Sequence, residues 1–417
     1  MHILVLGAGV VGTTTAWFLQ KQGHQVTVID RQNQAGLETS YANGGQVSVS
    51  HAEPWANPSA PLKVLKWLTR PDAPLLFRPR FDPAQWRWAI AFLTECTSAK
   101  AAHNIRQMVN LGSYSRSQLQ ALRKDADVEY DHLEKGIIHF YTNPAEFDGA
   151  IEPTRIMQEL GCDRQIIDAD RAIELEPALK PIKNRIAGAT YTSEDESGDA
   201  LMFTQNLAKR CVEAGVEFRF GTEILGFEHA GDRILGVQTI REGRHETLRG
   251  DSYVLSLGSY SAILARKIGL FLNIYPAKGY SITVPVNNEE AAYNVSLTDD
   301  EYKLVFSRLG DSLRVAGTAE LNGYSRDLNL SRCRAIVRRT AEIMPEAGLW
   351  DQAEFWTGLR PATPSNVPYV GKSHFANLYL NTGHGTLGWT HSCGSAAALA
   401  DIVDGRKPEV DFTFSGV

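Results

Sequence analysis

The first thirty residues alternate short apolar runs with a segment of helical periodicity. Residues 2–6 form an apolar run of the kind found in buried parallel strands. Residues 13–22 carry apolar side chains along one helical face, and Gly23 supplies a helix stop. A second apolar run, residues 25–30, ends at Asp30. The pattern predicts a strand–helix–strand unit with two parallel strands.

The rest of the chain mixes helical and strand-like patterns. Further helices are predicted over 103–126, 200–214 and 389–403. Residues 224–241 alternate like a meander, and residues 278–320 form a long alternating, mostly strand-like stretch. Shorter strands are predicted over 136–142, 187–192, 216–220, 252–257 and 378–381. Residues 36–48 are rich in glycine, serine, asparagine and alanine, which is typical of a loop.

Composition narrows the class of protein. The chain has 417 residues, 43% hydrophobic and 22% charged, and a net charge of -6, which is ordinary for a globular protein of two or three domains. The mild charge gives no reason to expect nucleic-acid binding. Five scattered cysteines favour a reducing compartment, and no His/Cys spacing predicts a metal site. No leader segment and no membrane-spanning stretch is expected.

A glycine motif follows the first predicted strand and opens the first helix. Gly7, Gly9 and Gly12 fit G-x-G-x-x-G, in which the glycines serve a tight turn, close approach of a pyrophosphate and close helix packing. The helix N-terminus favours the anion. Asp30 lies where a carboxylate accepts hydrogen bonds from ribose hydroxyls and repels a 2′-phosphate, which disfavours NADP. The context predicts a dinucleotide site but leaves FAD and NAD open.

Two further loops favour FAD over NAD. The segment Glu38–Gln46 has hydroxyls at Thr39 and Ser40 for phosphate oxygens, and paired glycines that allow backbone to pass close to a flat ring. The segment Asn381–Gly388 is a glycine loop that opens a helix, whose N–H groups suit negative charge on a reduced flavin. A solvated loop and a simple helix cap are the alternatives.

Other polar residues are candidates for substrate binding. Arg360 lies between glycine and proline on a stiff backbone, and its planar fork suits a carboxylate, with a structural salt bridge as the alternative. Tyr280 and Tyr302 each offer a hydroxyl or simple packing. His51 and His384 are the histidines nearest the proposed flavin loops, although a lone histidine is more often structural.

With these residues assembled, the chain resembles the bacterial FAD-dependent D-amino acid dehydrogenases, within the D-amino acid oxidase and glycine oxidase group. The resemblance covers essentially the whole chain. It is carried by Val5–Gly12, Val28–Arg31, Glu38–Ser40, Pro61–Lys63 with Lys66–Trp67, Phe203–Ala208, Gly258–Ser261, Tyr275–Pro276 with Lys278–Ser281, Phe355–Pro361 and Asn381–Thr390. After Gln46 the family usually reads Ile-Ser-Pro-Gly-Tyr, whereas this chain reads Val-Ser-Val-Ser-His, which leaves the substrate preference open.

The resemblance implies a fold and a set of site residues. The fold class is α/β, with a Rossmann-like FAD-binding domain and a second α+β substrate domain built on a mainly antiparallel sheet. The expected FAD-binding domain comprises 1–50, 195–265 and 350–417, and the substrate or cap domain comprises 51–194 and 266–349. The expected cofactor-binding residues are Gly7, Gly9, Val10, Val11, Gly12, Asp30, Arg31, Thr39, Ser40, Asn43, Gly44, Gly45, Gln46, Ile224, Gly258, Gly385, Thr386, Leu387 and Gly388. The expected catalytic residues are Arg360, Tyr302, Tyr280 and His51.

The implied activity is oxidative deamination of D-amino acids to 2-oxo acids and ammonia. Arg360 is expected to anchor the substrate carboxylate so that hydride leaves Cα for FAD, and water then hydrolyses the imino acid. Electrons are expected to pass to a quinone or another acceptor rather than to oxygen. Two alternatives stay open: an FAD enzyme for another amine (D-hydroxyproline, D-proline, glycine or sarcosine), and a non-catalytic dinucleotide-binding sensor.

Residues 51–90 differ in composition from the rest of the chain. They hold seven of the 18 prolines, four of the eight tryptophans, six basic residues and three acidic ones. Basic and aromatic residues together suit an anionic bilayer surface and quinone entry. A proline-rich cap packed on the flavin domain is an equal alternative. The expected location is cytoplasmic, with peripheral attachment to the inner membrane as one possibility; the oligomeric state is open.

Overall fold

A computed structural model describes residues 1–67 and 74–414 and contains two large sheets. The first has six strands in the order β19-β20-β13-β1-β2-β9, all parallel except for the antiparallel pair β19–β20. Its strands are β1 (His2–Leu6), β2 (Gln25–Ile29), β9 (Glu217–Arg219), β13 (Ser252–Leu255), β19 (Tyr369–Lys372) and β20 (Leu378–Thr382). The predicted strand–helix–strand unit is confirmed as β1, α1 and β2.

Both faces of this sheet are covered, as expected for strands that are apolar throughout. One face carries the helices α1 (Val10–Lys21), α4 (Ser98–Ala126), α7 (Ala200–Glu213) and α10 (Gly388–Val403). The other face carries α8 (Ser261–Arg266) and the meander β10 (Thr222–Ala230), β11 (Arg233–Arg241) and β12 (Arg244–Leu248). Along β1, Ile3 and Val5 belong to the first core and Leu4 and Leu6 to the second, because successive side chains point to opposite faces.

The second sheet has nine strands and is mainly antiparallel. Its order is β18-β14-β17-β16-β15-β5-β7-β6, with β4 beside β17; β15–β5 and β17–β4 are the parallel pairs. Its strands are β4 (Leu75–Phe77), β5 (Ile137–Tyr141), β6 (Gln165–Ile167), β7 (Gly188–Thr192), β14 (Tyr275–Pro285), β15 (Ser296–Asp299), β16 (Leu304–Leu309), β17 (Ser312–Leu321) and β18 (Glu354–Ala362). The predicted α/β class with a second, mainly antiparallel domain is confirmed.

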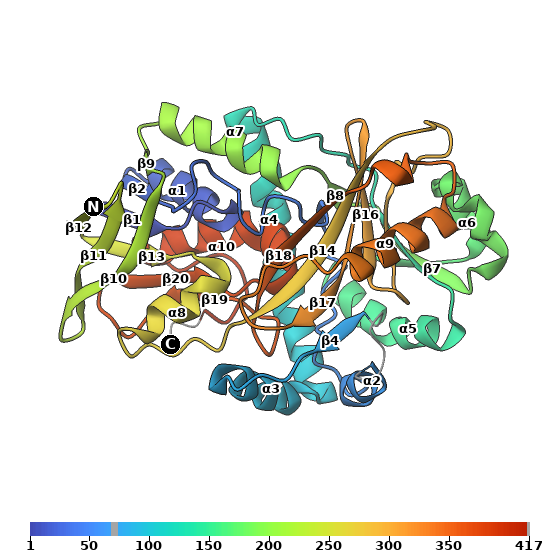
Figure 1. Cartoon of the computed structure of the whole chain (residues 1–417), viewed down its shortest axis with the longest axis horizontal. Coiled ribbons are helices and arrows are strands. Elements are labelled where there is room, and N and C mark those ends of the chain that lie inside the picture. Colours follow the sequence, from blue (N-terminus) through green and yellow to red (C-terminus); the bar gives the residue numbers. More distant parts are fainter. Residues whose placement is uncertain (68–73, 415–417) are drawn as a thin grey trace.

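Smaller elements surround the second sheet and connect the two. The helices are α2 (Ala60–Trp67), α3 (Pro83–Glu95), α5 (Pro144–Glu159), α6 (Ala169–Leu175) and α9 (Leu330–Ile343), with the short strands β3 (Gln46–Val47) and β8 (Glu196–Ser197). The 3-10 helices are η1 (Pro177–Arg185), η2 (Gly258–Tyr260), η3 (Trp350–Gln352) and η4 (Gly385–Leu387). In Figure 1 the parallel sheet fills the left half, the nine-stranded sheet fills the right half, and β14 and β18 lie where they meet.

Two elements depart from the expected division of the chain. β18 falls in the segment 350–417 assigned to FAD binding, yet it pairs along its length with β14 of the second sheet. α4 falls in the cap segment 51–194, yet it packs against α10 and contributes Leu111, Leu119 and Leu122 to the core of the parallel sheet. Sequence order does not reveal these exchanges because strand pairing and helix packing join segments far apart. We propose that β18 belongs to the substrate domain and α4 to the FAD-binding domain, with the rest of the expected division unchanged.

Two helix starts were predicted too late, whereas the helix predicted from residue 200 begins at Ala200 as expected. The first helix begins at Val10 rather than residue 13, directly after the extended residue Gly9. The helix predicted from residue 103 begins at Ser98, after Thr97, whose hydroxyl accepts a hydrogen bond from the Lys100 N–H at 3.4 Å. In this second helix the apolar pattern starts only where the helix meets its core, whereas the cap defines where it begins.

Candidate functional site

A cavity of about 1220 Å³ runs between the two sheets. It opens at the carboxyl ends of β1, β2 and β13, where loops leave the parallel sheet, and continues over the face of the nine-stranded sheet. Ligands of open parallel sheets bind at such strand ends. Of the nineteen residues expected to bind the cofactor, all but Gly12 line it.

The glycine motif has the backbone geometry that its sequence predicts. Gly7 has φ of +110°, and a Cβ there would lie 2.5 Å from the Ser256 carbonyl oxygen. A Cβ on Gly12 would overlap the Gly7 carbonyl oxygen, so Gly12 lies behind the loop and allows α1 to approach it. The first glycine thus permits the turn and the third permits the packing.

Asp30 follows β2 and holds the glycine loop in place. Its carboxylate accepts hydrogen bonds from the Ala8 N–H at 2.7 Å and the Gln32 N–H at 2.8 Å. Burial raises the pKa of Asp30, and the two N–H donors oppose that rise. The neighbouring Arg31 pairs with Glu38 at 2.7 Å and lies over the Tyr260 ring at 4.2 Å. One carboxylate therefore orders the loop at the place where a ribose is expected.

The segment from Thr39 to Gln46 crosses from one sheet to the other. The Ser40 hydroxyl accepts a hydrogen bond from the Val10 N–H at the start of α1, at 3.1 Å. Thr39 donates to the Leu359 carbonyl at 2.9 Å. At the other end, the Gln46 side-chain amide donates to the Leu297 carbonyl at 3.1 Å. The segment is therefore tied to the glycine helix and to the second sheet, with its glycines facing the cavity.

The C-terminal glycine loop supplies a second helix start at the cavity. α10 begins at Gly388 after η4, and its N-terminus has no side-chain cap. Because Gly385 to Gly388 line the cavity, the free N–H groups at this helix start lie at the cavity wall. His384 is buried and its Nε2 lies 3.0 Å from the Ser395 hydroxyl. Burial lowers the pKa of His384 to about 3, so this histidine is neutral.

Arg360 projects from β18 into the cavity. Its guanidinium lies over Gly279 of β14, where a Cβ would overlap it, and donates to the Thr318 carbonyl at 2.8 Å. No carboxylate pairs with it among residues 1–67 and 74–414. Burial alone lowers its pKa, to about 10. A half-buried cation that is held by a carbonyl inside a cavity and has no counter-charge is a site for an anionic group.

The two candidate tyrosines lie in different places. Tyr280 lines the cavity, but its hydroxyl donates to Glu320 at 2.5 Å, which also pairs with Arg78. Tyr302 is 43% exposed and stacks beneath the Arg339 guanidinium at 4.0 Å. Tyr302 is not among the cavity-lining residues, whereas its chain neighbour Lys303 is. The turn therefore places Tyr302 outside the cavity, contrary to its expected role beside Arg360.

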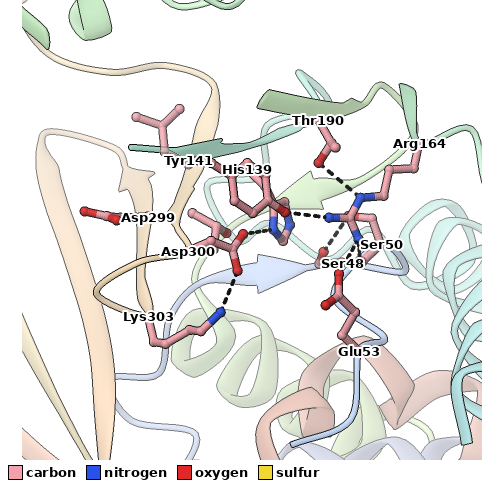
Figure 2. A network of polar contacts seen from close by, with 12 residues as sticks. Ser48, Ser50, Glu53, His139, Tyr141, Arg164, Thr190, Asp299, Asp300 and Lys303 are labelled. Atoms are coloured by element: carbon pink, nitrogen blue, oxygen red, sulfur yellow. Dashed lines mark hydrogen bonds and ion pairs between the residues drawn. The ribbon is translucent and has the colours of Figure 1, made fainter. Parts of the chain in front are cut away.

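His51 lines the far end of the cavity, beside residues that the sequence did not single out. Its ring lies 5.5 Å from that of His139. His139 Nδ1 lies 2.9 Å from Asp300, which pairs with Lys303 at 2.9 Å (Figure 2). Burial opposes the charge on Asp300, yet Lys303 and His139 hold its pKa well below the usual range. His139, Asp300 and Lys303 come from β5 and from the turn after β15, so no local pattern reveals them.

The loop that carries His51 is held by two buried charged residues. Asp195 accepts hydrogen bonds from the Ser50 hydroxyl at 2.6 Å and the Val49 N–H at 2.9 Å. Arg164 donates to the Ser50 carbonyl at 2.9 Å and to Glu53 at 3.2 Å, and Figure 2 shows its guanidinium among these groups. Sequence reasoning missed both, since neither lies near the loop in the chain.

Comparisons with known proteins agree with this geometry. The family model described as FAD dependent oxidoreductase matches residues 2–402. The chain is 54% identical over 415 residues to the D-amino acid dehydrogenase of Dechloromonas aromatica, covering 99% of both chains. It is 50% identical to the D-amino acid dehydrogenase of Paramagnetospirillum magneticum, covering 100% of this chain and 98% of the relative.

Solved structures share the fold. The glycine oxidase of Geobacillus kaustophilus superposes with a TM-score of 0.76 at 20% identity, covering 98% of this chain and 96% of that one. The family model spans both sheets and every loop of the cavity described above. The chain belongs to the FAD dependent oxidoreductase family.

Proposed function

We propose that the protein is a dehydrogenase that oxidises D-amino acids to 2-oxo acids and ammonia. The observation that carries the proposal is Arg360, a half-buried guanidinium with no carboxylate partner among the described residues, in the same cavity as the dinucleotide loops. An amino-acid carboxylate supplies the missing charge. Two full-length relatives at 54% and 50% identity bear the name D-amino acid dehydrogenase, which supports this substrate class.

The cavity suits two parts of FAD. α1 and α10 begin at the cavity without a cap from their own N-cap residues, so N–H groups at α1 would hold the pyrophosphate and those at α10 would meet the pyrimidine edge of the flavin. Side chains on Gly44 or Gly45 would overlap Val305 or crowd Ser307, which keeps that backbone close to the second sheet. When bound, FAD accepts the hydride from the substrate Cα.

The residues of this chain then position and enclose the substrate. Arg360 offers its planar fork to the carboxylate, and the Thr318 carbonyl fixes the orientation of the fork. Gly279 leaves the space that the guanidinium occupies. Trp356 and Leu359 line the cavity nearby and exclude water from the reacting carbon. Positioning and exclusion of water are thus the main contributions of the protein.

Flavin bleaching tests the proposal. The purified flavoprotein is mixed without oxygen with D- and L-alanine, D-proline, D-hydroxyproline, glycine and sarcosine, and the loss of flavin absorbance is recorded. We expect D-alanine to bleach the flavin faster than L-alanine and the other amines. Bleaching by another amine alone would assign a different substrate, and no bleaching by any of the panel would contradict the proposal. Slow return of absorbance in air is expected of a dehydrogenase, whereas fast return would indicate an oxidase.

Replacement of Asp30 is expected to weaken FAD binding. Asp30→Ala leaves the Ala8 and Gln32 N–H groups without their acceptor, and a buried unmade hydrogen bond costs about 1–3 kcal/mol. The dissociation constant for FAD should rise by about 10- to 100-fold, measured by flavin fluorescence on titration of the apoprotein. Asp251→Ala is the control, because Asp251 bonds the His2 N–H away from the cavity. An unchanged Asp30→Ala constant would contradict this role.

We further propose that the electron acceptor is a quinone reached at an anionic membrane surface. α3 presents Trp86, Ile90 and Leu93, 47%, 63% and 56% exposed and spaced on one helical face. The opposite face of α3 carries Phe92, which lines the cavity. This helix therefore separates the cavity from an exposed apolar face, and in Figure 1 it lies at the lower edge of the molecule.

Basic residues border this apolar face. Arg80 bonds Asn322, and Arg87 lies over the exposed Phe271 ring at 5.5 Å. Basic and apolar groups together suit an anionic bilayer surface. The side chain of Trp67 and residues 68–73, which the composition also points to, lie outside the described part of the chain. None of the helices in residues 1–67 and 74–414 is both long and apolar enough to cross a bilayer.

Serine replacements on α3 test the surface. The triple change Trp86→Ser, Ile90→Ser and Leu93→Ser should lower partitioning onto vesicles with anionic lipid about tenfold or more, because three exposed apolar side chains are lost. Flotation at low salt measures this, and anaerobic bleaching by D-alanine should persist.

A matched triple variant serves as the control. Ile151→Ser, Ile166→Ser and Val212→Ser remove exposed apolar side chains of similar exposure on α5, β6 and α7. If both triple variants float like the wild type, the α3 surface is not the contact. The same holds if both lose flotation equally.

A further inference from the structure

The far end of the cavity forms a polar wall that the reaction at Arg360 does not use. The wall consists of His51, Glu53, His139, Asp300 and Lys303, all of which line the cavity. His51 Nδ1 and His139 Nε2 are enclosed and have no hydrogen-bond partner among the described residues. Buried polar atoms without partners are rare in proteins and often mark a site for a ligand. The wall can therefore form hydrogen bonds with a polar group of a ligand in the cavity.

The wall is built as a rigid structure. Asp195 and Arg164 hold Val49 and Ser50, directly before His51, with buried hydrogen bonds, and Arg164 also donates to Glu53 after it. Lys303 adopts a left-handed backbone with φ of +54°, which is unfavourable for a lysine, and this conformation ends the turn from which it reaches Asp300. Fixed polar groups of this kind are typical of binding sites rather than of solvated surface.

The charges of the wall cancel before any ligand enters. Lys303 is paired with Asp300 at 2.9 Å, and Glu53 is paired with Arg164 at 3.2 Å (Figure 2). An acidic side chain would meet Glu53 and Asp300, and a basic one would meet Lys303, with Arg164 behind Glu53. A neutral group that both donates and accepts hydrogen bonds meets no opposing net charge. The unpartnered nitrogens His51 Nδ1 and His139 Nε2 offer two separate positions for hydrogen bonds, which suits a carboxamide because it carries both a donor and an acceptor.

The span of the cavity sets the length of that ligand. The Arg360 guanidinium contacts the Thr318 carbonyl on β17, and His139 lies on β5, with β16 and β15 between. The strand register places His139 level with Ala316, two residues before Thr318. Three strand spacings and this offset amount to about 16 Å. Two hydrogen bonds of about 2.9 Å leave about 10 Å between the substrate carboxylate and the wall. Of the two carboxamide side chains glutamine covers more of this distance than asparagine, whereas alanine falls well short of it.

We propose that the polar wall is a side-chain subsite that favours D-amino acids ending in a neutral carboxamide at about the length of glutamine. This proposal rests on the proposed D-amino acid oxidation and assigns its specificity. His51 is the specificity-determining residue, and Lys303 supports it as a second donor.

Matched substrates test the subsite in the wild-type holoenzyme. D-glutamine is compared with D-homoleucine, its hydrocarbon isostere, by kcat/KM with an artificial electron acceptor. We expect D-glutamine to be favoured at least tenfold, about the value of one or two hydrogen bonds to a substrate. The shorter pair, D-asparagine and D-leucine, should show a smaller preference. Equal rates for D-glutamine and D-homoleucine, or faster oxidation of D-glutamate or D-arginine than of D-glutamine, would overturn the proposal.

Variants identify the residues responsible. His51→Leu and, separately, Lys303→Met should each lower the D-glutamine to D-homoleucine ratio about five- to tenfold. His229→Leu is the control: His229 lies on β10 against Phe375, away from the cavity, and the ratio should not change. A ratio unaffected by both wall variants would contradict the assignment even if one of them folds poorly. If D-alanine itself fails to bleach the flavin, the proposed function fails instead, so the two failures are distinguishable.

Discussion

Replacement of Arg360 by methionine is expected to lower kcat/KM for D-alanine by about a thousandfold. The change removes a charge-assisted, two-point contact to the substrate carboxylate, and loss of one partner of a buried charge pair costs about 2–5 kcal/mol. Methionine keeps much of the apolar volume, so the Thr318 carbonyl is the main protein partner left unpaired. Stopped-flow bleaching with a range of D-alanine concentrations separates weaker binding from slower hydride transfer. Both should change, because the arginine also orients Cα.

Two further variants distinguish charge from geometry at this position. Arg360→Lys retains the charge without the planar fork and should recover only part of the loss. Gly279→Ala leaves Arg360 in the sequence but places a methyl group where the guanidinium lies, and it should impair D-alanine turnover in the same direction.

A matched arginine provides the control. Arg308→Met removes an arginine of β16 that pairs with Glu289 outside the cavity, and it should not affect the kinetics. Wild-type kinetics in Arg360→Met would exclude it as the carboxylate ligand.

The cofactor half of the site was accessible from the sequence because its determinants are local. The turn at Gly7, the packing at Gly12 and the carboxylate at Asp30 lie within one strand–helix–strand unit, and each imposes its geometry on its near neighbours. Gly7 and Gly12 have the expected backbone geometry, Asp30 lines the cavity after β2, and the family match confirms FAD. The C-terminal loop was likewise readable as a glycine loop before a helix.

The substrate half was less accessible because it depends on strand pairing between distant segments. His139 meets Asp300 only because β5 pairs in parallel with β15, about 160 residues later in the chain. Tyr302 and Lys303 are adjacent in sequence, yet the turn directs only Lys303 to the cavity. Proximity in sequence therefore does not tell which of two neighbouring side chains lines the cavity. β18, which carries Arg360, was assigned to the FAD-binding domain because its pairing with β14 is likewise a contact between distant segments.

Three histidines, of which His384 and His391 are buried and His51 is half-buried in the cavity, are expected to make the folded state sensitive to acid. Burial lowers the pKa of His51 and His384 to about 3 and of His391 to about 4. His51 faces His139, Asp300, Lys303 and Arg164; His384 faces His391, which bonds the Met108 carbonyl. All three are therefore neutral when folded near pH 7, whereas in the unfolded chain each titrates near pH 6.5.

Stability falls at low pH because the unfolded chain takes up more protons than the folded protein. Below pH 6.5 the unfolded chain binds protons that the folded protein excludes, so the stability present above pH 6.5 is lost as the pH falls toward 4. Each histidine should lower the free energy of unfolding by about 2 kcal/mol between pH 8 and pH 5, or about 6 kcal/mol together. Urea unfolding of the holoprotein at the two pH values, followed by circular dichroism, measures this loss.

A single substitution isolates one histidine from every other titrating group. His391→Gln removes the group that must stay neutral and keeps an amide near the Met108 carbonyl, so the variant should lose about 2 kcal/mol less than the wild type between pH 8 and pH 5. The exposed His245 on β12 is the matched control, and His245→Gln should leave the pH dependence unchanged. Equal losses in His391→Gln and the wild type would show that His391 takes up its proton in the folded state. Because the comparison is between two pH values in each variant, any stability lost at both pH values through the substitution itself cancels.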